Sequence, residues 1–253
     1  MKILLINPFS KFAAVRQYNL AKAMAMQGHE VTLMLPKFDK YSGYKKLQFE
    51  IPKNLTITHP KQFNSEKLEL SMLPYIPSAL RKKNNKQYDI IHGFRPTPFS
   101  GYIGSKIAKK LQVPFILEMG DEEWQTMAAL KTHPGYRVKI VKYLERKLMR
   151  EAAGITTMSP SLAKTLTGTY KREVKAIPSG IEIDTFSPLN HNPEIRKEFE
   201  NNVSAKKFMI FVGKLDKSTH IRDVIKILTK CNELGLVIVG AGPGKEELQN
   251  LAT

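Results

Sequence analysis

The 253-residue sequence is poor in cysteine and has no long apolar run. Cys231 is the only cysteine, so no disulfide can form within the chain, and this fits a reducing cytoplasm. No stretch reaches about 18 consecutive apolar residues, so we expect no transmembrane helix. The N-terminal MKILLINPFSK is interrupted by polar residues too early for a secretory leader and is typical of a first strand. We therefore expect a cytoplasmic protein, either free or peripheral to the membrane on its cytoplasmic face.

Positive charge is the feature in excess. The formal net charge is +17, and it is unevenly distributed: residues 186–253 carry 10 Lys and Arg against 8 Asp and Glu, whereas residues 1–185 carry 30 against 15. Such a surplus favours polyanions, namely nucleic acid, an anionic membrane surface or phosphorylated small molecules, although a solvated lysine-rich surface has the same composition. No nucleic-acid-binding motif accompanies the charge, so no specific nucleic acid partner is predicted.

Short apolar runs alternate with helical patterns along most of the chain. Residues 13–27 and 136–152 repeat apolar side chains at helical spacing, and Ser159–Pro160 is a typical helix start. Strands of this continuous apolar kind, separated by helices, predict an α/β fold with a parallel sheet covered on both faces. The predicted strands are residues 2–6, 30–35, 55–58, 88–92, 113–118, 154–158, 174–177, 207–212 and 235–239.

Two stretches interrupt this alternation. Residues 60–87 combine an apolar patch with a basic cluster, a pattern that suits a membrane surface but also an ordinary loop beside a solvated helix end. Residues 184–206 are rich in proline, asparagine and charge, as expected of a linker with a short helix. We therefore predict domains at 1–185 and 207–253, joined by a linker at 186–206.

Two strand ends carry glycine-rich corners. Gly213 and Lys214 directly follow the predicted strand 207–212, and Lys217 comes three residues later. The following strand ends in a similar corner, VIVGAGPG. In parallel sheets, ligands collect at the carboxyl ends of strands, where backbone N–H groups at helix starts favour phosphate. Either the glycines serve only tight turns, or the two corners bind a nucleotide or phosphate.

A dinucleotide fingerprint does not explain the second corner. The G-x-G-x-x-G spacing requires a third glycine where this sequence has Lys245. A flavin or nicotinamide cofactor is therefore not expected.

The series of segments resembles the GT-B glycosyltransferases, specifically the retaining family 4 type. The match runs in order along nearly the whole chain, in KILLINPF, LAKAMAMQGHEVTLML, YDIIH, VPFILEMGDEEW, LERKLMREAAGITTMSPSL, AIPSGIEIDTFSP, IFVGKLDKS and LVIVGAGPGKEEL. The resemblance implies two Rossmann-like domains, the first a doubly wound parallel sheet that takes the acceptor and the second a partial domain that takes the nucleotide-sugar. The substrates implied are a nucleotide-sugar donor and a sugar, lipid-linked or small-molecule acceptor, with no cofactor and no metal expected.

The resemblance also implies donor-side residues. Gly213 and Lys214 would lie near the donor diphosphate, and Gly240 and Gly242 would flank the nucleotide. Lys214 replaces the usual arginine, so it offers a point charge without a bidentate fork. A cation there stabilises the charge that gathers on the departing nucleoside diphosphate, which gives Lys214 a catalytic role. The resemblance also implies that the leaving phosphate takes the acceptor's proton, as in retaining members of the family, so no protein base is expected.

Asp121 matches the family's aspartate after the fifth strand, near the sugar and acceptor, and is the second catalytic candidate. It could equally be an acid at a helix start. The other acceptor-side candidates are His92, Arg95 and Lys11. We predict His92 at a strand end that faces the cleft.

The sequence departs from the family pattern in three places. Lys11 and Phe12 stand where two adjacent glycines are usual, so a side chain intervenes at the sugar. The lysine expected after Lys214 falls on Thr219, and Lys217 is its candidate substitute. No two glutamates stand eight residues apart, so the family's sugar-binding pair is absent and the second domain is expected to be truncated.

These features leave three functions open. The first is a retaining glycosyltransferase. The second is a non-catalytic nucleotide- or glycan-binding protein that needs a partner, and the third is a basic polyanion-binding protein.

Overall fold

The computed structural model describes residues 1–7, 15–35, 51–59, 88–130, 134–184, 186–202, 205, 207–216, 219–231 and 233–252. The chain divides into two compact units, Met1–Gly180 and Ile181–Thr253. The division precedes the predicted domain end at residue 185. No helix among the described residues is long and apolar enough to cross a membrane.

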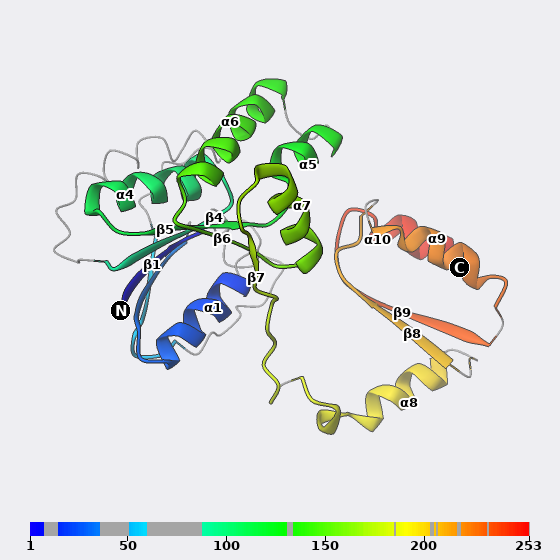
Figure 1. Ribbon diagram of the computed structural model, residues 1–253. Helices are drawn as coiled ribbons and strands as arrows, with labels where there is room; N and C mark the ends of the chain where they lie inside the picture. Colours follow the sequence, from blue (N-terminus) through cyan, green and yellow to red (C-terminus); the bar gives the residue numbers. More distant parts are fainter. Residues whose placement is uncertain are drawn as a thin grey trace. The chain divides into compact units, whose positions relative to one another are not determined.

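A parallel sheet of seven strands forms the centre of the first unit, in the order β3-β2-β1-β4-β5-β6-β7 (Figure 1). Neighbouring strands are parallel throughout. The strand order reverses at β1, so its carboxyl edge beside β4 is a topological switch point, where α/β proteins bind ligands. The strands are β1 (Lys2–Ile6), β2 (Glu30–Met34), β3 (Leu55–Thr58), β4 (Ile90–Phe94), β5 (Phe115–Met119), β6 (Gly154–Thr157) and β7 (Lys175–Ala176).

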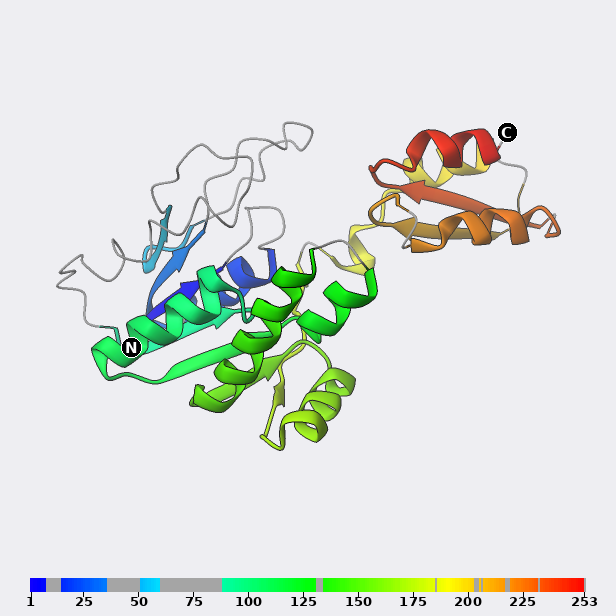
Figure 2. The ribbon, with the colours of Figure 1, turned by 90° about the horizontal axis from the view of Figure 1, so that it is seen from above.

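Helices cover both faces of this sheet. Helix α1 (Val15–Met26) packs on one face, where Ile3 and Leu5 of β1 join its buried residues. On the other face Leu4 and Ile6 of β1 join a second core. The alternation of β1 side chains thus supplies both cores. The helices of the second face are α4 (Ile103–Leu111), α6 (Gly135–Glu151) and α7 (Pro160–Tyr170), and α5 (Glu123–Leu130) lies beside α6. Figures 1 and 2 show α1 on one side of the sheet and α4 and α6 on the other.

The predicted parallel α/β fold is confirmed, with two strands displaced. Strands predicted at 88–92 and 113–118 lie at Ile90–Phe94 and Phe115–Met119. Pairing sets these limits, because the register of β4 with β1 begins where Ile90 lies beside Ile3. Gly93 has no side chain, and a Cβ at that position would lie 3.0 Å from the Phe115 ring of β5. The predicted helix start is also confirmed: the Ser159 hydroxyl accepts a hydrogen bond from the Leu162 N–H at 3.1 Å.

The second unit pairs β8 (Lys207–Val212) with β9 (Leu234–Val239) in parallel. Helices α9 (Ile221–Leu228) and α10 (Lys245–Ala252) cover one face through a small core that includes Ile225. The predicted linker contains a 3₁₀ turn, η3 (Pro188–Asn190), and helix α8 (Pro193–Asn202).

One leucine and one isoleucine on α6 test the core assignment. Leu148 is 0% exposed, whereas Ile140, about two turns earlier on the helix, is 47% exposed. We expect Leu148→Ala to lower the free energy of unfolding by about 2–5 kcal/mol, because it leaves a cavity against the sheet. Ile140→Ala should change it by less than about 1 kcal/mol. Chemical denaturation measures both, and equal losses would contradict the packing described.

Candidate functional site

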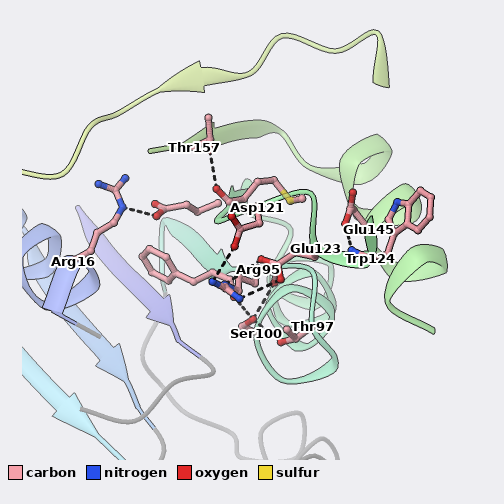
Figure 3. Close-up of polar contacts among 12 residues, drawn as sticks. Arg16, Arg95, Thr97, Ser100, Asp121, Glu123, Trp124, Glu145 and Thr157 are labelled. Carbon is pink, nitrogen blue, oxygen red and sulfur yellow. Dashed lines mark hydrogen bonds and ion pairs between the residues drawn. The ribbon is translucent and has the colours of Figure 1, made fainter. Parts of the chain in front are cut away.

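A polar cluster lies at the carboxyl ends of β4 and β5 in the first unit (Figure 3). The Arg16 guanidinium, at the start of α1, donates to Glu118 Oε1 at 2.7 Å. It also donates to the Ile177 carbonyl at 2.7 Å and to Ser179 Oγ at 3.2 Å. Arg16 therefore ties together α1, β5 and the segment that follows β7.

His92 lies beside this ion pair. Its Nε2 is 3.6 Å from Glu118 Oε2, and its ring stacks on Phe94 at 4.5 Å between centroids. Burial, and then the Arg16 charge, lower the pKa of His92 to about 4. Burial raises the pKa of Glu118, and the hydrogen bond from Arg16 opposes that rise. His92 is thus a neutral imidazole at neutral pH.

The predicted placement of His92 at a strand end is wrong. His92 is the middle residue of β4 and only 5% exposed, because the strand extends two residues beyond it. In this structure it contacts Glu118 and the core, so a role toward an acceptor would be exerted through Glu118.

Arg95 follows β4 in a left-handed conformation, with φ 67°. Such a backbone is costly for a non-glycine residue and is held here by the surrounding contacts. The Arg95 N–H donates to the Glu118 carbonyl at 2.7 Å, and its guanidinium lies against Gly120, where a Cβ would be 2.9 Å from Nε. The Ser100 hydroxyl donates to the carbonyls of Phe94 and Arg95 and fixes this turn.

Two carboxylates hold the Arg95 side chain. Arg95 Nε is 3.1 Å from Glu123 Oε1, and Nη2 is 3.5 Å from Asp121 Oδ2. Burial raises the pKa of Glu123 to about 7; Arg95 opposes the rise, and Asp121 and Glu145 add to it. The Asp121 side chain is 53% exposed and Arg95 is 32% exposed, so both can meet a ligand.

The two glycine-rich corners, which follow β8 and β9, pack backbone to backbone. Together they form one feature, which we call the corner of the second unit. The Gly213 N–H donates to the Val239 carbonyl at 3.0 Å, and the Leu215 N–H donates to the Ala241 carbonyl at 3.0 Å. The Gly244 N–H returns a bond to the Leu215 carbonyl at 2.9 Å. These bonds continue the β8–β9 pairing past the ends of the strands.

This packing explains the glycines of the second corner. A Cβ on Gly240 would be 1.9 Å from the Gly213 carbonyl oxygen, and one on Gly242 would be 2.2 Å from the Leu215 carbonyl oxygen. Glycine is therefore required at both positions for the two loops to pack together, whether or not the corner binds a ligand. Lys214 lies on this corner with its side chain 70% exposed, and its Nζ is 2.7 Å from Asp216 Oδ2.

A pocket of about 260 Å³ lies beside the corner, at the start of α9 and α10. Its carboxylates repel phosphate but accept hydrogen bonds from hydroxyl groups. An ion pair between Arg222 and Glu247 joins the two helices at this pocket. The lining residues are Asp216, His220, Ile221, Arg222, Asp223, Gly244, Glu247 and Leu248.

The structure brings together two groups of predicted site residues. Asp121 and Arg95 lie at the carboxyl edge of the first sheet, whereas His92 is buried within β4. Gly213, Lys214, Gly240 and Gly242 form the corner of the second unit. Lys11 and Lys217 lie outside the described residues. The functional assignments of these residues stay predictions.

Sequence reasoning missed Arg16, Glu118 and Glu123. Two signals were available. An acid inside an apolar strand, as in FILEM, needs a buried partner, and an arginine in the first turn of a helix opposes the helix dipole, so another contact must hold it there.

The sequence model of Glycosyltransferase Family 4 matches residues 13–185. The sulfoquinovosyl transferase SQD2 of Arabidopsis thaliana is 25% identical over 193 residues, which are 74% of this chain and 36% of that protein. The chain therefore spans about a third of the length of this curated relative.

Solved structures share the fold. Sucrose-phosphate synthase from Thermosynechococcus elongatus matches with a TM-score of 0.73 and 16% identity, over 99% of this chain and 67% of that one. Anabaena Alr3699/HepE in complex with UDP-glucose matches with a TM-score of 0.64 and 16% identity, over 99% of this chain and 65% of that one. The predicted GT-B fold is confirmed by these likenesses, and the covered shares are consistent with a partial second domain.

The raised pKa of Glu123 predicts a pH dependence. Its folded-state pKa of about 7 lies above the ordinary 4.5, so the folded protein keeps a proton that the unfolded chain loses between these values. This group's contribution to the free energy of unfolding therefore falls as pH rises from about 4.5 to about 7. An NMR titration of the Glu123 carboxyl should show a midpoint near 7.

Neighbouring charges provide the controls for this titration. Arg95→Met should raise the Glu123 midpoint further, because the guanidinium opposes the rise, and Asp121→Asn should lower it. A wild-type midpoint near 4.5 would contradict the burial described for this carboxyl.

Gly240 provides a test of the corner. Gly240→Ala should destabilise the second unit by about 1–3 kcal/mol, because the new methyl group collides with the Gly213 carbonyl. Gly244→Ala is the matched comparison: its Cβ would be 3.2 Å from the Leu215 carbonyl oxygen, a tight contact but no collision, so the loss should be clearly smaller. Hydrogen exchange of the β8 and β9 amides measures the effect. Unchanged protection in Gly240→Ala would refute the loop packing.

Proposed function

The chain belongs to Glycosyltransferase Family 4, and on that premise we propose that it transfers a sugar from a nucleotide-sugar to an acceptor with retention of configuration. The observation that carries the proposal is the family match over residues 13–185, joined to a fold shared along 99% of the chain with sucrose-phosphate synthase. The acceptor is a glycan, a lipid or a small molecule, and the protein acts in the cytoplasm.

The corner of the second unit is the proposed donor site. Lys214 supplies an exposed cation there, paired with Asp216. Gly213, Gly240 and Gly242 add no side chains of their own. The cation neutralises the diphosphate as the bond to the sugar breaks. The neighbouring pocket, with Asp216, Asp223 and Glu247 at its wall, suits the hydroxyl groups of a ribose or a sugar.

The carboxyl edge of the first sheet is the proposed acceptor side. Asp121 and Arg95 are the exposed residues that touch the sugar or acceptor. The buried Glu123 carboxylate positions the Arg95 side chain through their ion pair. His92 and Glu118 support this edge from within the sheet. The acceptor proton passes to the leaving phosphate, so Asp121 orients hydroxyl groups and is not required as a base.

A ligand panel tests the donor assignment. A ligand that binds only the folded protein raises its thermal midpoint. Since HepE was solved with UDP-glucose, UDP-sugars head the panel, followed by GDP- and ADP-sugars and free diphosphates. We expect one nucleotide class to raise the midpoint selectively, and Lys214→Ala to weaken its binding by about ten- to a hundredfold, because a hydrogen bond to a charged group is lost.

Lys226→Ala is the matched control, because it removes one exposed positive charge from α9 in the same unit. It should leave the affinity unchanged. Unaltered binding in Lys214→Ala would refute the diphosphate assignment. Selective binding without release of the nucleoside diphosphate over a panel of glycan and lipid acceptors would instead favour the non-catalytic binding protein.

A further inference from the structure

The outer face of α6 carries a line of exposed aromatic and aliphatic side chains. Tyr136 is 61% exposed, Ile140 is 47% exposed and Tyr143 is 63% exposed. Their spacing of three and four residues places them on one face of the helix. Leu148 and Met149, on another side of the helix, are buried in the core against the sheet, so α6 is fixed in the domain and the line of Tyr136, Ile140 and Tyr143 lies on its exposed side.

Positive charge surrounds this line. The helix sequence GYRVKIVKYLERKLMRE contains six basic residues and two acids. One acid, Glu145, is fully buried and accepts a hydrogen bond from Tyr170, and the other, Glu151, lies 4.0 Å from Lys147 at the end of the helix. Lys139, Arg146 and Arg150 are exposed. The outer face of α6 is therefore strongly basic as well as partly apolar.

Helix α4 extends the basic surface. It lies in the same layer as α6 in both views (Figures 1 and 2). Lys106 of α4 and Lys147 of α6 approach the same Tyr102 ring, at 5.4 and 5.8 Å from its centroid. The last turn of α4 adds Lys109 and Lys110. The two helices thus form one continuous basic layer on this side of the sheet.

We infer that the outer face of α6, flanked by α4, docks on an anionic lipid surface. An interfacial helix needs this combination: tyrosine, with an apolar ring and a polar tip, an aliphatic residue in the same line, and lysine and arginine along the edges for lipid phosphate. The helix of 17 residues offers a contact roughly 25 Å long. Nucleic acid would use the same charge but gains nothing from the exposed Ile140 at the centre, so a membrane fits better.

Vesicle cosedimentation of the full chain tests the inference. We expect binding to phosphatidylcholine vesicles that contain phosphatidylglycerol, no binding to phosphatidylcholine alone, and loss of binding as salt rises. Each basic residue near such a surface contributes roughly fivefold in affinity. Lys139→Glu/Arg146→Glu/Arg150→Glu should therefore weaken binding on the order of a hundredfold or more. Tyr136→Ser/Tyr143→Ser should weaken it while leaving the salt dependence in place.

The control variant changes the same net charge elsewhere in the first unit. Lys53, Lys164 and Lys175 are exposed and lie before β3, on α7 and on β7. Their replacement by glutamate should leave most of the binding intact. Circular dichroism and the thermal midpoint establish that each variant is folded.

Three outcomes would overturn the inference. One is a wild-type protein that does not bind anionic vesicles at low salt. Another is an equal loss of binding in the α6 and control variants, which would mean that net charge alone attracts the lipid. The third is an α6 variant that keeps vesicle binding but loses affinity for a duplex oligonucleotide, which would make this face a nucleic acid interface. Vesicle binding needs no donor sugar, so these outcomes are separate from the success or failure of the proposed transfer reaction.

Discussion

Parallel pairing is the constraint on which the first unit depends. Because β1, β4 and β5 all point the same way, their carboxyl ends meet at one edge of the sheet. The strand order reverses between β1 and β4, so α1 and α4 leave on opposite faces of the sheet and open space there for polar side chains. Arg95 and Asp121, far apart in sequence, become neighbours there only because of this pairing.

Burial sets the chemistry of the polar groups at this edge. Glu118 and Glu123 are largely withdrawn from water, and each is matched by one guanidinium, Arg16 or Arg95. The arginines reduce the cost of burying the carboxylates but do not cancel it, which is why the pKa values of both acids lie above their ordinary range. The edge is thus ion-paired within and charged at its rim, where Arg95 and Asp121 meet solvent.

The corner of the second unit is shaped by backbone contacts and not by buried ion pairs. There the backbone itself makes the close contacts, and glycine at 240 and 242 removes the side chains that would prevent them. Lys214 is then displayed on a fixed loop, beside a pocket whose carboxylates favour hydroxyl groups over phosphate. The cation and the carboxylates of this corner are adjacent, since Lys214 is paired with Asp216, which also lines the pocket.

Local sequence determined the secondary structure of this protein, because periodicity, apolar runs and cap residues act within a few residues of one another. The strands, the helix that begins after Ser159 and the basic surplus before residue 186 were all readable in this way. Only the tertiary structure decided which side chains meet. The partner of Arg16 is 102 residues away, and the position of His92 depended on the register between β4 and its neighbours. Those contacts follow from strand order and register, which no local pattern encodes.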